Sequence, residues 1–272
     1  MQLPSESEGV IVPPPYLSAS SISTWKQCPL RYKLSRIDKI PEGTSEALLM
    51  GSFVHEVLEH LYKQPAAERT LLNAKQISSY IWATNNWQQQ VEQIVHTEQG
   101  VRQLRWNSWW CIENLWIIED PMHVEPSGVE NEVGGEIATG VVLKGFIDRY
   151  SVSENGGLKI SDYKTGKAPK MKKWLEEKWY QLSIYAMLLG EELQKPIDEL
   201  ELIFLKEAVK FTHKPTPEDI EDVRQDIIKT HKEITEACAS KEFDAKVGKL
   251  CDWCSYQGIC PAWVGKKRGR KW

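Results

Sequence analysis

The sequence predicts an α/β protein in which helices flank a mixed β-sheet. Two runs of strand-forming residues, 141–150 and 158–164, enclose an Asn-Gly-Gly turn at 155–157, which is typical of an antiparallel hairpin. Further strands are expected at 128–138 and 200–207, and an amphipathic helix separates the hairpin from the last strand. The order β-β-β-α-β indicates an α/β core with helices packed over the sheet.

Helical periodicity marks further regions of the chain. One helix is expected to begin at Ser21 or Ser23, and another at Ser52, directly after a glycine. Residues 73–120 have a helical pattern and hold half of the tryptophans, for which core packing is favoured over base stacking. A charged helix is expected at 217–240. The helix after the hairpin has an apolar stripe formed by Leu175, Trp179, Leu182, Ala186 and Leu189.

These elements divide the chain into four expected regions. The N-terminal segment is rich in Pro, Ser and Glu, which predicts a flexible arm. The regions are an arm at 1–16, a helical region at 17–127 that carries Cys28 and His55, the sheet core at 128–210, and a C-terminal helix with a cysteine-rich segment at 211–272.

The composition indicates a cytoplasmic globular protein. With 272 residues and 41% apolar content, the chain can bury a sizeable core. Six cysteines without an N-terminal apolar targeting segment argue against a secreted disulfide framework. No run approaches the roughly 20 apolar residues that span a bilayer, so we expect no membrane association.

The charge distribution argues against a globally basic surface. Because 34 basic residues face 38 acidic ones, the net charge is −4, and no overall field attracts nucleic acid. Basic residues are nevertheless concentrated just after the second hairpin strand, and such a local patch can contact phosphates. The expected nucleic-acid-binding residues there are Lys170, Lys172 and Lys173, with Lys167 beside them.

Two aspartates of the hairpin form the most informative pair of the sequence. A pairing mirrored about Asn155 puts Asp148 opposite Asp162, and cross-strand Cβ atoms lie about 4.5–5.5 Å apart. Two carboxylates at that separation can share a divalent cation. Because side chains alternate along a strand, Lys164 shares a face with Asp162.

This arrangement is typical of metal-dependent phosphodiester hydrolysis. Hard oxygen ligands hold a cation such as Mg²⁺, which lowers the pKa of a bound water and neutralises charge on the phosphorane. The ammonium of Lys164 would orient that water or stabilise the same charge. A partly exposed salt bridge between Lys164 and a nearby aspartate accounts equally well for the hairpin alone.

The C-terminal segment contains a second constellation. The spacing Cys251-x2-Cys254-x5-Cys260 places three thiols within ten residues, and Cys28 precedes a proline just as Cys260 does. Four thiolates suit an iron–sulfur cluster or a structural zinc. A zinc site commonly has two Cys-x2-Cys pairs, so one remote cysteine plus a trio favours the cluster; zinc and free thiols stay open. The other two cysteines, Cys111 and Cys238, are expected to be buried thiols.

Taken together, these segments resemble the RecB-family exonucleases of the PD-(D/E)XK superfamily, in particular small stand-alone bacterial or phage members. AddB-type subunits and CRISPR-associated spacer-acquisition nucleases share the cysteine arrangement, which holds a [4Fe-4S] cluster in those proteins. The resemblance therefore implies a restriction-endonuclease-like fold and an iron–sulfur lobe. It rests on LSASSISTWKQCPLRY at 17–32, GSFVHEVL at 51–58, GFIDR at 145–149, DYKTG at 162–166, QLSIY at 181–185 and CDWC with a later CP at 251–261.

The resemblance implies a role for each matching residue. His55, Asp148, Asp162 and the carbonyl of Tyr163 would bind Mg²⁺ or Mn²⁺, and Lys164 would be the catalytic lysine. Without the resemblance, His55 is more simply a surface or capping histidine. Its distance of five residues from the next histidine excludes a zincin, in which the histidines are four apart.

Further roles follow from the same resemblance. Gln181 and Tyr185, four apart on one helical face, would lie near the DNA, and the motif would add them to the catalytic residues. Ile147 stands where the superfamily name has proline, but family members commonly carry Ile-Asp-Arg there. An upstream acidic residue also recurs in relatives. Glu130 is not assigned to it, because Gly134-Gly135 shifts the register. The cluster ligands would be Cys28, Cys251, Cys254 and Cys260.

The leading hypothesis is a Mg²⁺- or Mn²⁺-dependent DNA exonuclease that is stabilised by a [4Fe-4S] cluster. It would act on DNA ends or single strands in recombination, repair or phage DNA processing, with a possible helicase or recombination partner. One alternative is a non-catalytic DNA-binding or scaffold subunit of a helicase–nuclease complex. Another is a sequence-specific restriction endonuclease whose recognition module would be the 73–120 helices.

Overall fold

The computed structural model describes residues 10–263, except for the side chains at 172–174. Residues 1–9 of the expected arm therefore lie outside the described residues. The chain forms two compact units. The central unit comprises Thr44–Gly134 and Gly145–Glu221; the terminal unit comprises the described parts of Met1–Gly43, Gly135–Lys144 and Asp222–Trp272. No helix among the described residues is long and apolar enough to cross a membrane.

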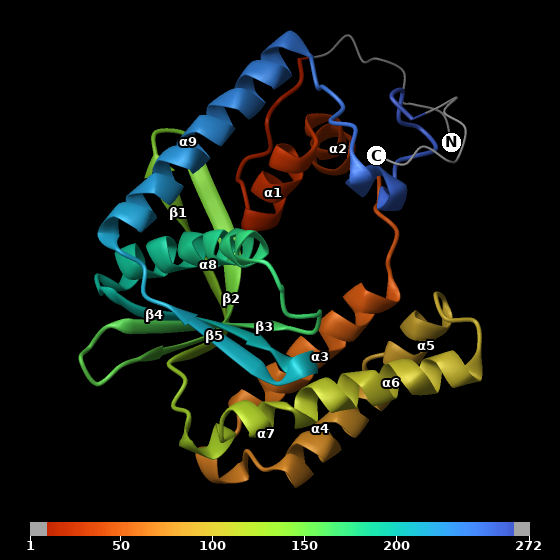
Figure 1. Cartoon of the computed structure of the whole chain (residues 1–272), viewed down its shortest axis with the longest axis vertical. Helices are drawn as coiled ribbons and strands as arrows, with labels where there is room; N and C mark the ends of the chain where they lie inside the picture. Colours follow the sequence, from red (N-terminus) through yellow and green to blue (C-terminus); the bar gives the residue numbers. More distant parts are fainter. Residues whose placement is uncertain (1–9, 264–272) are drawn as a thin grey trace. The chain divides into compact units, whose positions relative to one another are not determined.

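A mixed five-stranded sheet has the strand order β1-β2-β3-β4-β5 (Figure 1). Strand β3 pairs antiparallel with β2 and parallel with β4, and β4 pairs antiparallel with β5. The strands are β1 (Gly128–Ala138), β2 (Val141–Val152), β3 (Leu158–Lys164), β4 (Ile197–Phe204) and β5 (Val209–His213). This confirms the predicted α/β class with a mixed sheet.

The β2–β3 hairpin has the predicted register. Arg149 pairs with Ser161, and the three following pairs keep the same register down to the turn. Continued by one step, this register would bring Asp148 opposite Asp162, as the mirror symmetry about the turn predicts. Gly156 has a φ of +83°, a left-handed conformation that glycine adopts without steric cost.

Helix α8 (Lys172–Leu193) connects the two parallel strands β3 and β4 and contacts both of them. Parallel neighbours need such a crossover connection, usually a helix. Three residues of the predicted apolar stripe, Leu182, Ala186 and Leu189, are buried. The 3.6-residue periodicity therefore identified the buried face of this helix correctly.

The two C-terminal strands differ from the prediction. Strand β4 ends at Phe204, and the last residues of the expected strand, Leu205–Glu207, form a 3-10 turn. The chain then turns at Ala208, which has a left-handed φ of +51°. Strand β5 was not predicted: its first four residues alternate between apolar and polar, but the strand is only five residues long.

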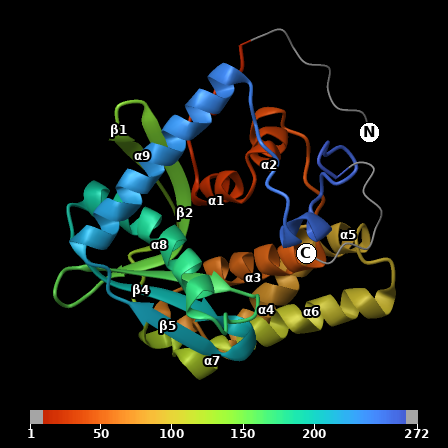
Figure 2. The ribbon, with the colours of Figure 1, turned by 45° about the horizontal axis from the view of Figure 1, so that its top comes forward.

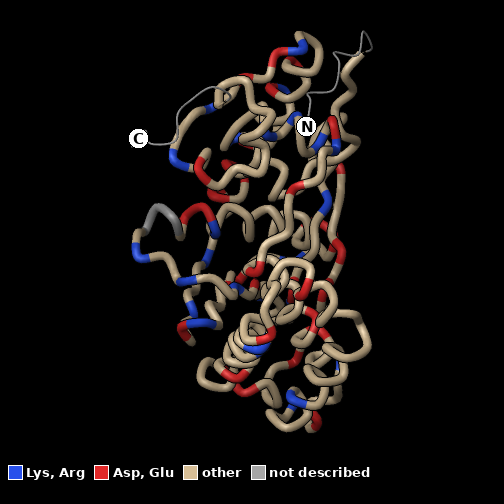
Figure 3. The backbone as a smooth tube through the Cα atoms, turned by 90° about the vertical axis from the view of Figure 1, so that its right-hand side faces the viewer, with Lys and Arg blue, Asp and Glu red and all other residues tan. Residues whose placement is uncertain are grey.

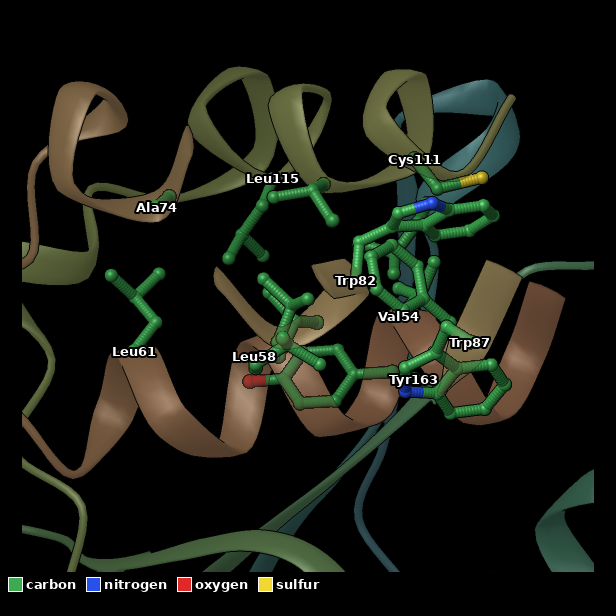
Figure 4. Packing of buried hydrophobic residues seen from close by; sticks show 14 of the residues in the cluster. Val54, Leu58, Leu61, Ala74, Trp82, Trp87, Cys111, Leu115 and Tyr163 are labelled. Atoms are coloured by element: carbon green, nitrogen blue, oxygen red, sulfur yellow. The ribbon is translucent and has the colours of Figure 1, made fainter. Parts of the chain in front are cut away.

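The remaining helices of the central unit enclose an apolar core, into which Tyr163 points from β3 (Figure 4). Trp82 and Trp87 are buried there, which confirms core packing for these two, whereas Trp106 and Trp110 are exposed. The helices are α3 (Glu46–Tyr62), α4 (Leu71–Thr84), α5 (Trp87–Glu92), α6 (Glu98–Glu113) and α7 (Leu115–Ile118), with 3-10 turns at Ala66–Glu68 and Pro121–His123.

Helix α3 begins six residues before the predicted Ser52. Ser45 is its N-cap, and the Ser45 hydroxyl accepts the backbone N–H of Leu48 at 3.3 Å. Gly51, which the prediction took as the boundary, lies inside the helix. A glycine in a helix interior costs about 1 kcal/mol, which the buried face of α3 offsets.

The terminal unit joins segments from both ends of the chain (Figure 2). The Trp25 indole donates to Glu233 at 3.0 Å, the Leu30 N–H donates to the Asp244 carbonyl at 3.2 Å, and the Tyr256 hydroxyl donates to the Ile40 carbonyl at 2.7 Å. Its helices are α1 (Ala19–Gln27), α2 (Pro29–Tyr32), a π-helical turn (Lys33–Ile37), a 3-10 turn (Lys249–Trp253) and α9 (Pro217–Ser240), whose first residues belong to the central unit. The bounds of α9 are as predicted.

Candidate active site and cysteine cavity

Three side chains of the central unit converge as a candidate metal-binding group. His55 of α3, Glu130 of β1 and Asp148 of β2 each offer one ligand atom, and these atoms lie within 4.8 Å of one another. The His55 Nδ1 atom lies 3.4 Å from Asp148 Oδ1 and 3.7 Å from Glu130 Oε1. One imidazole and two carboxylates form a donor set that suits a divalent cation.

Glu130 enters this group through an unusual backbone conformation. Its φ is +48°, in the left-handed region, although it lies within strand β1. That conformation costs a residue with a Cβ about 1–2 kcal/mol and recurs at functional sites. Sequence reasoning considered Glu130 as the upstream acidic residue but left it out, because Gly134-Gly135 shifts the register of the strand.

His55 is held between carboxylates and a backbone carbonyl. Its Nε2 lies 3.0 Å from the carbonyl oxygen of Tyr163, whereas its Nδ1 faces the carboxylates. Burial opposes the charge of His55, but Asp148, Glu130 and Asp162 favour it more strongly and raise its pKa to about 10. The surrounding negative potential thus attracts a positive charge.

The two oxygens of Asp148 have different partners. Oδ1 faces His55, as described above, and Oδ2 accepts the backbone N–H of Tyr163 at 2.7 Å. This hydrogen bond crosses from β2 to β3 and fixes the carboxylate relative to the strand that carries Asp162. The hairpin therefore orients Asp148 through its own backbone.

Asp162 and Lys164 form a buried ion pair beside this group. Asp162 Oδ2 lies 2.6 Å from Lys164 Nζ, without the angles of a hydrogen bond. Burial, followed by the charge of Asp148, raises the pKa of Asp162, while Lys164 opposes that rise. Burial lowers the pKa of Lys164, but Asp162 and Asp148 outweigh it and keep the ammonium protonated. Asp162 thus lies close to His55, Glu130 and Asp148, but its carboxylate is not within 4.8 Å of all three of their ligand atoms.

Helix α8 carries Gln181 and Tyr185, and Tyr185 lies near Asp162 and Lys164 of the hairpin. The Gln181 amide donates to the Tyr185 hydroxyl at 3.3 Å. The Tyr185 ring lies against Gly145, where an added Cβ would be 2.4 Å from the ring, so the glycine of the GFIDR segment is sterically required. Burial raises the pKa of Tyr185, and the charges of Asp162 and Lys164 also act on it.

A cavity of about 620 Å³ opens at the candidate metal-binding group. Of the predicted nucleic-acid-binding lysines, Lys170 is exposed and is not among the lining residues. The side chains of Lys172 and Lys173 lie outside the described residues. The lining includes His55, Glu130, Lys164, Thr165, Lys167 and Lys178.

The terminal unit contains a separate cavity that is lined by the predicted cluster ligands. Its volume is about 50 Å³, and Cys28, Cys251, Cys254 and Cys260 all line it. The four thiols are half-buried and free of disulfides. Among the described residues, no three of their sulfurs lie within 4.8 Å of one another, whereas a tetrahedral zinc holds sulfurs about 3.8 Å apart. Cys111 and Cys238 are buried, as predicted.

Comparisons with known proteins agree with this architecture. The chain matches the PD-(D/E)XK nuclease superfamily over residues 16–261. It is 26% identical to the Gene 69 protein of Mycobacterium phage D29, over 91% of this chain and 97% of that protein. It is 30% identical over 57% of its length to one subunit of an ATP-dependent helicase/deoxyribonuclease from Carboxydothermus hydrogenoformans, where the match covers 16% of that protein.

A solved structure supports the fold. The crystal structure of a candidate exonuclease from Eubacterium rectale superposes with a TM-score of 0.59, over 100% of this chain and 96% of that one, at 15% identity. This likeness and the family match confirm the restriction-endonuclease-like fold that the sequence predicted. Because the family match spans well over half of the chain, the protein belongs to the PD-(D/E)XK nuclease superfamily.

Proposed function

We propose that this protein is a metal-dependent DNA exonuclease of the RecB type. The proposal rests on the convergence of His55, Glu130 and Asp148 at an open cavity. The Asp162–Lys164 ion pair lies beside them. A ligand set and a catalytic ammonium in one cavity are the components that phosphodiester hydrolysis requires.

The ligands of a divalent cation, Mg²⁺ or Mn²⁺, would be His55, Glu130, Asp148 and the Tyr163 carbonyl. When bound, the cation would lower the pKa of a water and neutralise charge on the attacked phosphate. Asp148 is already oriented by the Tyr163 N–H, so its carboxylate needs little rearrangement to serve as a ligand. Asp162, which lies next to this set, would be a further ligand of the cation.

Lys164 would act on the phosphate and on the attacking water. Its ammonium is charged and largely buried, and Asp162 holds it in place. A positioned cation in a water-poor site stabilises developing negative charge more strongly than one in bulk water. Asp162 would thus orient Lys164 in addition to its expected role as a ligand, while Gln181 and Tyr185 would contact the DNA strand from α8.

Cleavage of DNA is supported by one relative and end-dependent cleavage by one structural neighbour. The solved structure with this fold is a candidate exonuclease, and the helicase/deoxyribonuclease match shows that related sequence occurs in a DNA-degrading complex. The phage relative matches over nearly its whole length, and a role in phage DNA processing, recombination or repair stays part of the proposal.

The four cysteines would hold a [4Fe-4S] cluster. They converge from both ends of the chain on one cavity, and no three of their sulfurs lie as close together as a single tetrahedral zinc requires. The Cys251 sulfur accepts the Gly248 N–H at 3.4 Å, a contact that would stabilise a thiolate. The cluster would be structural, because its ligands belong to the terminal unit and the catalytic residues to the central unit.

The test is digestion of DNA labelled at one end. We expect linear DNA to be degraded with Mg²⁺ or Mn²⁺ and preserved in excess EDTA, while covalently closed circles remain intact. Efficient cutting of single- and double-stranded circles would instead establish an endonuclease. A protein that binds DNA but cleaves neither substrate with either metal would be the non-catalytic alternative.

A further inference from the structure

Two lysines line the active-site cavity without a carboxylate partner among the described residues. Charged residues of both signs are interspersed along the chain (Figure 3), and several lysines have ion-pair partners, such as Lys164 with Asp162. By contrast, neither Lys167 nor Lys178 forms an ion pair with any residue that the structure describes.

The other cavity carboxylates are already engaged. Glu56 accepts hydrogen bonds from the Trp87 indole, at 2.6 Å, and from the Asn85 amide. Glu59 pairs with Lys63, and Glu130 faces His55. The acidic side chains that line the cavity thus interact with groups other than Lys167 and Lys178. The ammonium groups of these two lysines can therefore bind an incoming anion.

Lys178 lies on α8 next to the catalytic pair. Burial lowers its pKa, and the ammonium of Lys164 lowers it further, while Asp162 acts in the opposite direction. Two neighbouring ammonium groups repel each other in the absence of an anion. A bound phosphate would relieve that repulsion, and a cavity next to the hydrolytic residues is where a substrate phosphate would lie.

Neutral donors surround the two lysines. The hydroxyls of Ser52 and Thr165 line the same cavity, and Gly166 leaves open space beside the loop that follows β3. Hydroxyls and ammonium groups together are a common phosphate-binding combination. The cavity volume of about 620 Å³ is in the range of a small-ligand pocket.

We propose that Lys167 and Lys178, with the hydroxyls of Ser52 and Thr165, form a second phosphate subsite, which holds a phosphate next to the scissile one on a single nucleic-acid strand. This subsite rests on the proposed nuclease function and deepens it. The lysines act as binding residues that set the position of the strand, and Lys164 remains the group that acts on the reacting phosphate.

The first test compares Lys167→Gln, Lys178→Gln and the double variant with the wild type. Binding of a single-stranded oligonucleotide is measured with Ca²⁺ in place of the catalytic metal, over a series of salt concentrations. Each substitution should weaken binding about five-fold at low salt and reduce the slope of log K against log salt by about 0.7. In cleavage assays KM should rise by a similar factor while kcat changes less.

Two matched variants serve as controls. Lys75→Gln removes an exposed lysine of α4 that does not line the cavity, and it should leave both the salt slope and KM unchanged. Lys178→Arg keeps the charge and should recover most of the affinity. Wild-type salt slopes in the Lys167 and Lys178 variants would overturn the subsite, as would a loss in kcat with no change in KM.

The second test needs no variant and therefore cannot fail through misfolding. Wild-type protein is acetylated briefly in the presence and absence of the oligonucleotide, and modified lysines are quantified by mass spectrometry. Lys167 and Lys178 should be protected several-fold and Lys75 should not. Absence of protection in a protein that cleaves DNA would refute the subsite alone, whereas a wild type that neither binds nor cleaves would refute the nuclease function itself.

Discussion

Arg149 forms a buried, two-pronged ion pair with Glu119, on the face of β2 opposite to its neighbour Asp148. One guanidinium nitrogen lies 3.0 Å from Glu119 Oε2, the other bonds Oε1, and only 3% of the Arg149 side chain is exposed. The guanidinium also lies over the rings of Tyr62 and Tyr163, at 4.7 and 5.5 Å from their centroids. Arg149 follows Asp148 and Tyr163 follows Asp162, so the contact between Arg149 and Tyr163 links the two strands directly beside the aspartates.

We predict that Glu119→Gln destabilises the protein by up to about 3–5 kcal/mol, because it removes the nearer of the two carboxylates that face the buried guanidinium and leaves only Glu201, at 3.6 Å. Replacing both Glu119 and Arg149 with Gln should cost much less than the sum of the two single changes. Urea denaturation of the four proteins measures this coupling. Additive single effects would show that the pair does not interact. Exposed Lys75→Gln should stay within about 0.5 kcal/mol of the wild type.

A second prediction separates metal binding from catalysis. Asp148→Asn should lose both Mn²⁺ affinity and cleavage, since it removes one ligand charge from the group with His55 and Glu130. Lys164→Ala should retain Mn²⁺ binding but lower cleavage by about 10²–10³-fold or more, because it removes only the positioned ammonium. Calorimetric titration with Mn²⁺ and cleavage of linear DNA are the two measurements. Wild-type turnover by Lys164→Ala would refute the catalytic assignment.

Glu130 provides a third prediction, on strain. Glycine adopts the left-handed backbone without the Cβ penalty, so Glu130→Gly should be about 1 kcal/mol more stable than Glu130→Ala. Both variants should lose metal affinity. Thermal denaturation and metal titration test these effects separately. If Gly and Ala variants are equally stable, the backbone at this position is not strained in solution.

The hairpin and the Glu130 distortion show what the sequence could and could not predict. The register that brings Asp148 opposite Asp162 follows from the turn and the side-chain alternation, both of which are local properties of the chain. The left-handed conformation of Glu130 in β1 follows from no local pattern, and Glu130 was left unassigned because Gly134-Gly135 shifts the register. Likewise, the start of α3 was placed at Gly51-Ser52, because the Ser45 cap lies in a polar segment with weak periodicity.

A fourth prediction concerns acid stability. Glu201 is fully buried, and its Oε1 lies 2.9 Å from both Lys159 and Lys210. Burial opposes its ionisation, but Lys210, Ser161 and Lys159 outweigh burial and hold its pKa below the ordinary value of 4.5. Because the folded pKa is the lower one, Glu201 contributes its full stability above about pH 4.5, and the contribution falls as pH drops through the folded pKa.

Glu201→Gln should therefore be less stable than the wild type at pH 7, and the difference should shrink as the pH is lowered below 4.5. Urea midpoints across pH 3–7 measure it. The matched control is Glu199→Gln, whose carboxylate also pairs with Lys159 but is partly exposed; its effect should be within about 1 kcal/mol. A difference for Glu201→Gln that does not change with pH would contradict the assigned ion pairs.

The last prediction concerns the cysteine cavity as a link between the chain ends. Cys28 and Cys251 are separated by 251 − 28 = 223 residues, and closing so long a loop through a shared cluster is associated with about 5 kcal/mol of unfolded-state entropy. Anaerobically purified protein should contain iron and absorb broadly near about 400 nm. Cys28→Ser should lose iron, colour and thermal stability together, although no catalytic residue is touched.

The matched control is Cys238→Ser, which changes a buried cysteine of the same unit that does not line the cavity. It should retain iron and colour, even if the buried hydroxyl costs some stability. Colourless protein with bound zinc from an anaerobic preparation would favour the zinc alternative. If Cys254→Ser lost the metal while Cys28→Ser kept it, the trio would bind metal locally and the ends would not be linked, since a link requires Cys28 as a ligand.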